Sequence, residues 1–355
     1  MKGNALLRLV GAQSAQSVKI VVNRLTDSVS LVLFPWISGT EITSLVSITD
    51  AISAIENTLL KGHDPARDPA RSTVATAHGQ LLLMSAESQD AVGVKVAGVA
   101  PGNPALGLPR IQGIYLLMDR STLGPVALLD GPALTSLRTP AVSGVAAKYL
   151  ARPNAENLVV FGAGPQARNH IAAMCAVRSI RNVTIVARSM TNIEPLLRYS
   201  ETLGLLARSL RADESQHVED VVEKADLVVC ATTSATPLFR GSAVRDGTCV
   251  LAIGSHEPKV REVDGALVGR SYVFVEDRAT ALRESGDVIM AIEEGFLEST
   301  SLISIRELVS AHTTFAHEAK PSLFKSSGMA WQDLAVAEQV LLRKNAPGNR
   351  DLHSD

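Results

Sequence analysis

The sequence predicts an α/β protein in which a doubly wound parallel sheet is joined to a smaller α+β domain. Two observations support this prediction. From Asn157 onward, short apolar runs alternate with Gly-rich turns and helical stretches, which is typical of parallel β–α–β units. Between about residues 80 and 139, apolar runs follow one another with only turn-forming residues between them, which indicates a separate sheet with one buried face.

The composition is that of a globular protein. Hydrophobic residues make up 46% of the 355 residues and charged residues 20%, which excludes a disordered chain and suffices for two domains of roughly 150 residues each. The 34 Lys and Arg against 36 Asp and Glu give a formal charge of −2 without a dense basic block. This balance argues against nucleic acid or a membrane surface as a partner. No apolar run approaches the ~18 residues that span a bilayer.

The cysteines and histidines show neither a disulfide nor a metal pattern. Three cysteines without a C-x-x-C pair are typical of reduced thiols in the cytoplasm. Cys230 and Cys249 lie in apolar, strand-like runs and are expected to be buried, and Cys175 is the third. His312 and His317 do not share a helical face, so no metal site is predicted.

Residues 1–38 are expected to be an N-terminal extension. The four basic residues of this segment all precede its first acidic residue, Asp27, and no firm period emerges. A targeting peptide, an over-long start and a lightly packed extension are the alternatives, and the first is disfavoured because no small-residue cleavage site follows an apolar core. Regular structure is expected to begin near Thr43, with one helix whose apolar face extends to Leu59.

Each strand is predicted from a short apolar run bounded by turn residues. In the first domain the runs are Leu81–Met84, Val92–Val96, Ile114–Met118 and Val126–Leu129, followed by a helix over Ala141–Leu150. In the second domain they are Leu158–Phe161, Val183–Ala187, Leu227–Cys230, Val250–Gly254 and Tyr272–Val275. A last amphipathic helix, Trp331–Arg343, is expected to return to the first domain and make it discontinuous.

A glycine-rich turn indicates a dinucleotide site. The apolar run Leu158–Phe161 leads directly into Gly-Ala-Gly-Pro-Gln-Ala (162–167) and then a helix, which is the context that the Rossmann-type fingerprint requires. Gly162 allows the tight turn and Gly164 lets the backbone approach a pyrophosphate, which the free N–H groups of the helix bind. Ala167 replaces the third glycine, a substitution that the fingerprint tolerates.

The cofactor is expected to be NADP(H), with NAD(H) as the alternative. The second strand of this domain ends in Arg188-Ser189, where an NAD site usually has an acidic residue for the ribose 2′-hydroxyl. Arg188 can instead pair with a 2′-phosphate. A solvent-exposed arginine at a strand end is the competing interpretation.

Motifs along most of the chain resemble the ornithine cyclodeaminase/μ-crystallin family. They are Pro109–Gly113, Ala127–Asp130, Leu134–Ser143, the turn 162–167, Ala231–Ser234, Gly254–Pro258 and Phe324–Ala330. The resemblance covers about residues 40–345 and implies a homodimer. It also implies an NAD(P)-binding domain over 140–328, a dimerisation and substrate domain over 39–139 plus 329–350, and an active site between them.

The resemblance also implies roles for single residues. Arg71, Lys95 and Arg138, which are 24 and 43 residues apart, match the family's substrate-carboxylate cluster, with Arg67 as a rival of Arg71. Such cations fix the carboxylate so that the Cα faces the nicotinamide, and like-charged neighbours lower the pKa of a lysine so that it can exchange a proton. The predicted nucleotide contacts are Arg138, Thr139, Gly162, Gly164, Gln166, Ala167, Arg188, Ser189, Thr232, Gly254 and Ser326.

His256 stands where the cyclodeaminase branch of the family has an aspartate. Histidine can exchange a proton near neutral pH but gives no fixed negative charge for the distal ammonium of ornithine. We therefore predict a reductase of small α-imino or α-amino acids in which Lys95 and His256 are catalytic and Δ1-pyrroline-2-carboxylate is reduced to L-proline. Ornithine cyclodeamination to proline and ammonia, and a μ-crystallin-like NADPH-dependent binding protein with little turnover, are the alternatives.

Overall fold

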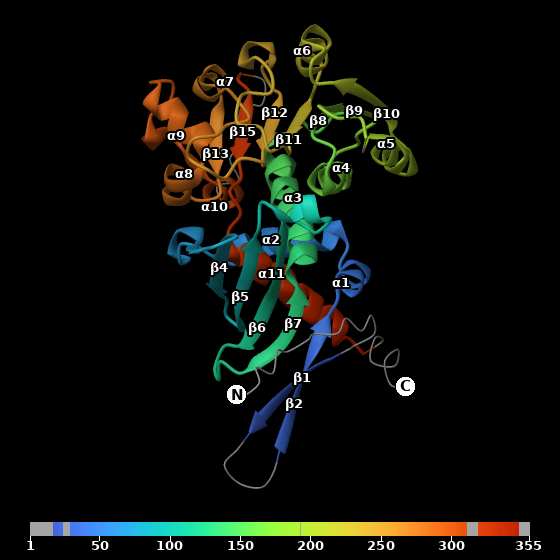
Figure 1. Ribbon diagram of the computed structural model, residues 1–355. Helices are drawn as coiled ribbons and strands as arrows, with labels where there is room; N and C mark the ends of the chain where they lie inside the picture. The colour runs from blue at the N-terminus through green and yellow to red at the C-terminus, as the bar shows by residue number, and fades with distance from the viewer. Residues whose placement is uncertain (1–16, 24–28, 192, 311–318, 348–355) are drawn as a thin grey trace.

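The computed structural model describes residues 17–23, 29–191, 193–310 and 319–347, and two sheets organise them (Figure 1). The first sheet has seven strands in the order β1-β2-β7-β6-β5-β4-β3. The second has eight strands in the order β10-β9-β8-β11-β12-β15-β13-β14. The mixed α/β fold class is confirmed. No helix in these ranges is long and apolar enough to cross a membrane.

The strands have the following bounds. The first sheet consists of Ser17–Asn23 (β1), Val29–Ile37 (β2), Ser72–Thr76 (β3), Gly79–Glu87 (β4), Ala91–Val99 (β5), Ile111–Asp119 (β6) and Pro125–Asp130 (β7). The second consists of Asn157–Phe161 (β8), Asn182–Ala187 (β9), Leu206–Arg211 (β10), Leu227–Cys230 (β11), Cys249–Ala252 (β12), Tyr272–Val275 (β13), Ile303–Ser304 (β14) and Ser322–Lys325 (β15).

The α-helices alternate with these strands. They are Gly39–Leu45 (α1), Ile48–Leu60 (α2), Gly131–Leu150 (α3), Pro165–Val177 (α4), Ile193–Thr202 (α5), Ser215–Glu223 (α6), Gly265–Arg270 (α7), Arg278–Glu284 (α8), Gly286–Glu293 (α9), Ile305–Ser310 (α10) and Ala330–Lys344 (α11). Short 3-10 helices cover Pro65–Arg67, Asn103–Leu106, Gly241–Ala243 and Ser299–Ser301.

The predicted strands of the first sheet are confirmed as β4 to β7. Each is antiparallel to its neighbour, and burial alternates along β5, as expected when only one face is covered. Helix α11 packs against β4 and β5 and crosses behind the strands in Figure 1. Lys95, at the centre of β5, points to this covered face, together with Tyr115 of β6, with which it is paired in register.

Two expectations about the start of the chain are wrong. Strand β2 lies within the predicted extension and pairs in parallel with β7 through Trp36 and Ile37, so regular structure begins well before Thr43. The single predicted helix is interrupted, because Ser47 accepts a hydrogen bond from the N–H of Asp50 and its own N–H donates to the Asp50 carboxylate. This capping box starts α2 at Ile48 although the apolar spacing continues across the break.

The second sheet contains every strand predicted for it, at most one or two residues displaced. All pairs in it are parallel, and helices cover both faces. The sequence interpretation missed β15, which lies between β12 and β13 and is only four residues long. It also missed β10, the edge strand, whose residues are exposed or half-buried and therefore lack an apolar run.

Helix α3 connects the two sheets. It starts at Gly131, where the Asp130 side chain accepts from the N–H of Ala133, and continues through Pro140 to Leu150, so it is longer than the helix predicted from Ala141. It contacts α2, α4 and α11 as well as strands of both sheets. The predicted domain limit at 139/140 falls inside this helix, and the domain bounds stay a prediction.

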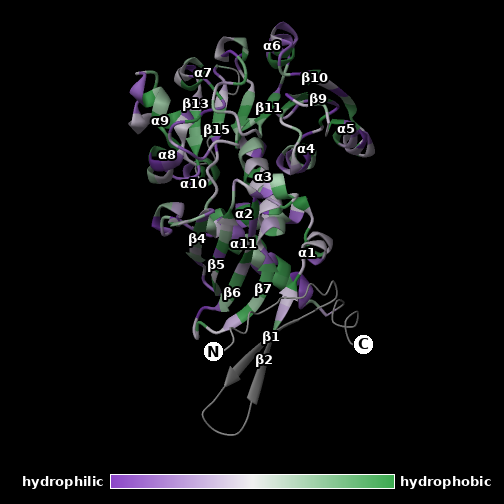
Figure 2. Ribbon diagram, viewed as in Figure 1, coloured by the Kyte–Doolittle hydropathy of each residue, from purple (hydrophilic) through white to green (hydrophobic). Residues whose placement is uncertain are grey.

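The core follows the sheets. Figure 2 shows hydrophobic residues along the central strands of the second sheet and hydrophilic residues on its outer helices. Buried apolar side chains from both sheets and from α2, α3 and α11 form one continuous cluster, and a second cluster lies on the other face of the second sheet. Cys249 in the first cluster and Cys230 in the second are fully buried, as expected, and burial raises the pKa of both thiols.

Candidate active site

Three elements place a buried ion cluster beside the second sheet. Lys95 comes from β5, Arg138 from α3 and Asp333 from the first turn of α11. The Lys95 ammonium donates to Asp333 Oδ2 at 2.7 Å and to the hydroxyl of Thr135 at 3.3 Å. Arg138 Nε lies 3.4 Å from Asp333 Oδ1. Two cations therefore share one carboxylate, and none of the three side chains is more than 8% exposed.

Arg71 joins this cluster from the loop before β3. Its Nη2 donates to the carbonyls of Ser327 and Gly328 at 2.8 and 2.7 Å. Gly328 also lies against Arg138, because a Cβ at this position would meet Arg138 Nη1 at 2.6 Å. Its φ of +78° further favours glycine. The structure thus brings Arg71, Lys95 and Arg138 together, and we refer to these three residues as the cation cluster. The rival Arg67 is 88% exposed and lies outside it.

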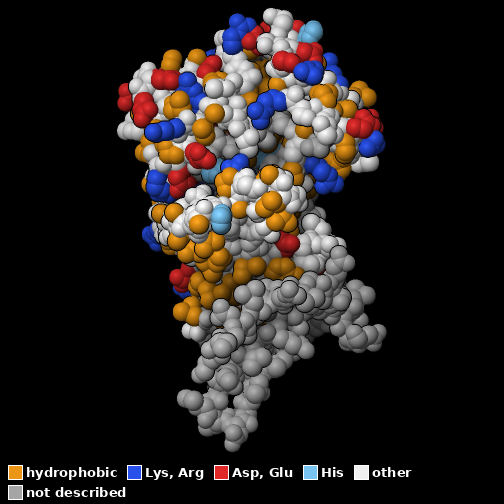
Figure 3. Space-filling model, viewed as in Figure 1, with side chains coloured by type: hydrophobic (Ala, Val, Ile, Leu, Met, Phe, Trp, Pro, Cys, Tyr) orange, Lys and Arg blue, Asp and Glu red, His pale blue; other side chains and the backbone are white. Residues whose placement is uncertain are grey.

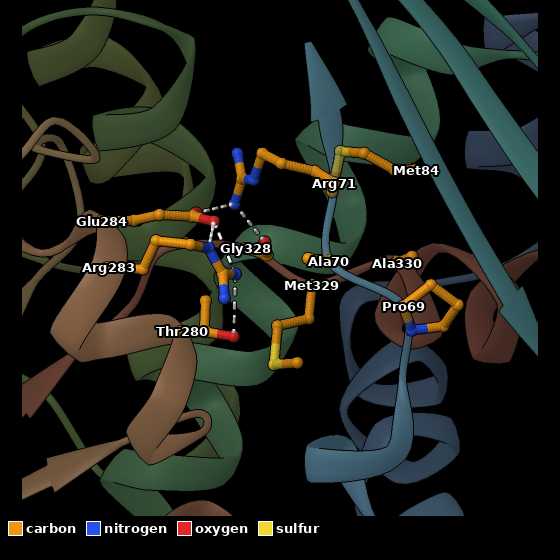
Figure 4. A pocket seen from close by; sticks show the side chains of 10 residues that line it. All are labelled: Pro69, Ala70, Arg71, Met84, Thr280, Arg283, Glu284, Gly328, Met329 and Ala330. Carbon is orange, nitrogen blue, oxygen red and sulfur yellow. Dashed lines mark hydrogen bonds and ion pairs between the residues drawn. The ribbon is translucent and has the colours of Figure 1, made fainter.

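A small pocket opens beside Arg71 (Figure 4). The side chains of Arg71 and Arg283 approach Glu284 from different elements, at 2.8 and 2.7 Å. Met84 of β4 and Met329 supply apolar lining. Part of the pocket lining is therefore apolar. The rest includes two cations, Arg71 and Arg283, that share Glu284 as their counter-ion.

Burial changes the acidity of Lys95. Loss of water lowers its pKa from the ordinary value to about 8, with Asp333 opposing the change and Arg138 and Arg71 adding to it. The ammonium is charged at neutral pH but releases a proton easily. Two of its three N–H donors have partners among the described residues, so one donor remains for a ligand.

The glycine-rich turn has the conformation that a dinucleotide requires. Gly162 has φ of +114°, and a Cβ there would lie 2.5 Å from the carbonyl oxygen of Ala231. Gly164 is the N-cap of α4, it offers open space, and no side chain caps the helix. Among buried atoms in the described part of the chain, Thr139 Oγ1 and Gln166 Oε1 have no hydrogen-bond partner. The free N–H groups, the open space and the unpaired Thr139 hydroxyl, which can donate, fit a bound pyrophosphate.

The other predicted nucleotide contacts follow the carboxyl ends of neighbouring parallel strands. Arg188 and Ser189 are exposed after β9, one strand away from the turn. Thr232 and Gly254, after β11 and β12, are held by buried Glu262, which accepts from both N–H groups and from the Thr232 hydroxyl. The Thr232 hydroxyl thus already donates its hydrogen bond within the protein.

Ser326 and His256 occupy the same edge with different surroundings. The Ser326 hydroxyl is buried and donates to Glu276, away from the turn. His256 is exposed on the loop after β12, and the fully buried Lys325 holds this loop by donating to the carbonyl of Ser255. Displacement of water by the surrounding protein and the positive charge of Arg71 lower the pKa of His256. At neutral pH the imidazole is therefore a better proton acceptor than donor.

The anionic partners of the cation cluster were not predicted. They are Asp333, Glu276 and Glu284, together with the amide of Gln332. One signal was available, since Gln332 and Asp333 are polar residues in the first turn of an otherwise apolar-faced helix.

No group of three or more His, Cys, Asp or Glu side chains that could hold a metal ion occurs in the described ranges. His312 and His317 lie outside the described residues.

Comparisons with known proteins agree with this geometry. Residues 37–346 match the model of the ornithine cyclodeaminase/mu-crystallin family. A Delta(1)-pyrroline-2-carboxylate reductase of Bacillus thuringiensis is 33% identical over 314 residues, covering 86% of this chain and 94% of that protein.

Solved structures give the same result for the fold. A Thermococcus litoralis Delta(1)-pyrroline-2-carboxylate reductase in complex with NADH and L-proline superposes with a TM-score of 0.81 at 29% identity, covering 88% of this chain and 98% of that one. An archaeal alanine dehydrogenase dimer with bound NAD superposes with a TM-score of 0.80 at 27% identity, covering 88% and 96%.

Proposed function

Because the chain belongs to the ornithine cyclodeaminase/mu-crystallin family, we propose that it is a nicotinamide-dependent reductase of a cyclic imino acid such as Δ1-pyrroline-2-carboxylate. One observation carries the proposal: Lys95 and Arg138 share the single carboxylate of Asp333 in a buried cluster. The cluster lies next to the edge of the second sheet that carries the turn 162–167, Thr232 and Gly254, which we call the nucleotide edge. A bound reduced nicotinamide supplies the hydride that adds to the Cα of the C=N bond.

The charges of the site fit a ligand with one carboxylate. Four cations (Arg71, Lys95, Arg138, Arg283) face three carboxylates (Glu276, Glu284, Asp333). One positive charge is unmatched, and among the four cations Arg283 is the one that solvent reaches most, at 46% exposed. A monocarboxylate such as Δ1-pyrroline-2-carboxylate neutralises it. A dicarboxylate would leave the site negative.

Lys95 is the proton donor in this proposal. The imine nitrogen must gain one proton as the Cα gains hydride. Lys95 keeps one free N–H and a pKa of about 8, so it is protonated at neutral pH and gives up its proton at small cost. His256, with its lowered pKa, serves better to accept a proton or to shape the pocket.

We propose NADP(H) as the preferred cofactor. Arg188 directly follows β9, the strand beside the one that leads into the glycine-rich turn; it is exposed and makes no ion pair with any residue that the structure describes. A free guanidinium at this place can bind a 2′-phosphate in bidentate fashion. NAD(H), which the two solved relatives hold, stays the alternative.

We also propose a homodimer formed through the open face of the first sheet. Val74, Leu81, Leu83 and Ile114 on that face are 37–47% exposed. Strand pairing places Val74 beside Leu81 and connects this face across β3 to β6. Figure 3 shows hydrophobic side chains gathered over this sheet, while charged side chains cover the second. An apolar face of this kind marks an interface, and the similar alanine dehydrogenase is described as a dimer.

A two-part incubation tests the reaction. Purified protein is mixed with Δ1-pyrroline-2-carboxylate and NADPH or NADH, and separately with L-ornithine and NAD. We expect proline together with oxidation of the reduced cofactor in the first mixture and no ammonia in the second. Ammonia without net cofactor change would assign cyclodeamination, and binding without turnover in either mixture would assign a binding protein.

A further inference from the structure

Glu276 is a buried carboxylate that connects three segments of the active site. It directly follows β13 and is 2% exposed. Its Oε1 accepts from the Ser326 hydroxyl and from Gln332 Nε2, each at 2.8 Å. Its Oε2 accepts from the backbone N–H groups of Ser327 and Gly328 at 3.0 and 2.8 Å. With four donors, the carboxylate is fully used within the protein and has no free side for a ligand.

The first consequence concerns Arg138. Because a carboxylate only accepts hydrogen bonds, Glu276 forces the Gln332 amide to turn its Nε2 toward it. The Gln332 oxygen then faces the other way, where it accepts from Arg138 Nη1 at 2.9 Å and from the N–H of Met329 at 3.3 Å. All three side chains are buried. The orientation of the amide, and with it one anchor of Arg138, therefore depends on Glu276.

The second consequence concerns Arg71. The two N–H groups that Glu276 holds belong to the Ser327–Gly328 segment, and the carbonyls of the same two residues accept from Arg71 Nη2. Fixing these peptide groups fixes the oxygens that position the guanidinium. Glu276 thus reaches Arg71 through the backbone and Arg138 through a side chain.

We propose that Glu276 is a positioning residue for the substrate carboxylate, acting on Arg71 and Arg138 without touching the substrate. The inference rests on the proposed function, since the two arginines matter only if they hold a carboxylate. Glu262 offers a contrast beside the same sheet, because its carboxylate organises Thr232 and Gly254 on the nucleotide edge instead. Glu276 therefore acts on the cation cluster, and it reaches the predicted nucleotide contacts only through Ser326 and Arg138, not through the glycine-rich turn.

The test exchanges the carboxylate of Glu276 for an amide, first alone and then together with the reverse exchange at Gln332. In Glu276→Gln an amide NH₂ faces the NH₂ of Gln332, so Gln332 must flip and lose Arg138. We expect the KM for Δ1-pyrroline-2-carboxylate to rise at least about tenfold, the effect of losing buried hydrogen-bond partners. The Kd for NADPH, measured by fluorescence titration, should stay within about threefold because the glycine-rich turn, Thr232 and Gly254 keep all their contacts.

The double variant Glu276→Gln/Gln332→Glu supplies the rescue. It restores one amide donor facing one carboxylate. The amide oxygen introduced at position 276 still accepts from the two backbone N–H groups, and the carboxylate introduced at position 332 accepts from Arg138. We expect the KM of the double variant to return to within about threefold of the original. Arg138 and the two backbone N–H groups regain acceptors, and the Ser326 hydroxyl turns to accept from the introduced amide.

The matched control is Glu307→Gln. Like Glu276, Glu307 accepts from a hydroxyl and a backbone N–H; its further donor is the Arg278 guanidinium, and it lies outside the site. Its loss of charge is the same as in Glu276→Gln, so the KM of this variant for the imino acid should not change.

Three results would overturn the inference. They are an unchanged KM in Glu276→Gln, a Kd for NADPH that rises as much as the KM, and a double variant as impaired as the single one. If Glu276→Gln fails to fold, the folded double variant decides alone, since a normal KM supports the role and a raised KM contradicts it. If the double variant also fails to fold, Glu276 is required for the fold and the proposed positioning role is rejected.

Binding of pyrrole-2-carboxylate separates this inference from the proposed reaction. The ligand is a planar carboxylate that cannot be reduced, and its binding to the protein–NADPH complex is measured by thermal shift. If the protein binds pyrrole-2-carboxylate but does not reduce the imine, the proposed reaction is wrong. The role of Glu276 is then still tested by the affinities of the variants for pyrrole-2-carboxylate. If the protein does not bind it, no carboxylate is held and the positioning role fails as well.

Discussion

The nucleotide edge and the cation cluster are built in opposite ways. The turn at 162–167 is one short segment that offers backbone N–H groups, open space and a left-handed glycine. The cation cluster takes one side chain each from a loop, from β5 and from α3, and its counter-ion from α11. A cofactor site can therefore be encoded locally through backbone shape, whereas a substrate site that needs buried charges depends on the whole fold to pair them.

The largest expected effect is on the cation cluster. Arg138→Ala removes a guanidinium that shares Asp333 with Lys95, so kcat/KM for Δ1-pyrroline-2-carboxylate should fall about a hundredfold or more, as when a positioning contact is lost. Steady-state kinetics at fixed NADPH measures it. Arg120→Ala is the control, because Arg120 pairs with Glu87 on the surface. Unchanged activity in Arg138→Ala would remove this residue from the site.

A glycine substitution tests the other side of the comparison. Gly162→Ala places a methyl group against the Ala231 carbonyl at a positive φ, so the Kd for NADPH should rise about tenfold or more, from roughly 1–3 kcal/mol of strain. In Gly204→Ala the φ of +80° is similarly unfavourable but no atom lies within 4 Å of the new Cβ. This control should lose some thermal stability and keep its Kd. Equal nucleotide affinity in both variants would contradict a backbone-built site.

The pH dependence tests the charge of Lys95. A lysine is charged below its pKa, so kcat/KM should decline as the pH rises above about 8, by about tenfold for each unit. Asp333 raises this pKa, and Asp333→Asn should therefore move the decline to lower pH. Rate profiles between about pH 6 and 10 measure both. A decline at the same pH in both proteins would show that another group titrates.

The smallest effect is expected at the exposed end of the nucleotide edge. Arg188→Ala should raise the KM for NADPH about fivefold and leave that for NADH unchanged, because an exposed ion pair contributes about 1 kcal/mol. Arg198→Ala, which removes an exposed arginine paired with Glu194, is the control. A preference of tenfold or more for NADH in the unmodified protein would contradict the proposed cofactor.

The difference between the two sites also decides what the sequence could predict. The turn was found because its signals lie within ten residues and follow a periodic apolar run. The three cations were identified by resemblance alone, and their partners Asp333 and Glu276 were missed. No local pattern connects residues more than 100 positions apart, since only packing of α11 and β13 brings them to the cluster.

The errors in the fold have equally local causes. Apolar spacing alone joined α1 and α2 into one helix, although the Ser47–Asp50 capping box separates them. Strand β15 was missed because four residues, two of them polar, give no apolar run, yet it lies in the middle of the sheet. Its last residue, Lys325, is buried and lies 3.3 Å from Asp287 of α9, a pairing that only the folded chain supplies.

Isotope transfer would show whether the two sites act on one reaction. NADPH carrying deuterium at C4, on one face or on the other, is incubated with Δ1-pyrroline-2-carboxylate, and the proline is analysed by mass spectrometry. We expect one deuterium at Cα, from one labelled face only, in an amount equal to the cofactor oxidised. Unlabelled proline, or proline formed without oxidation of the cofactor, would show that the cation cluster does not hold an imino acid for direct reduction.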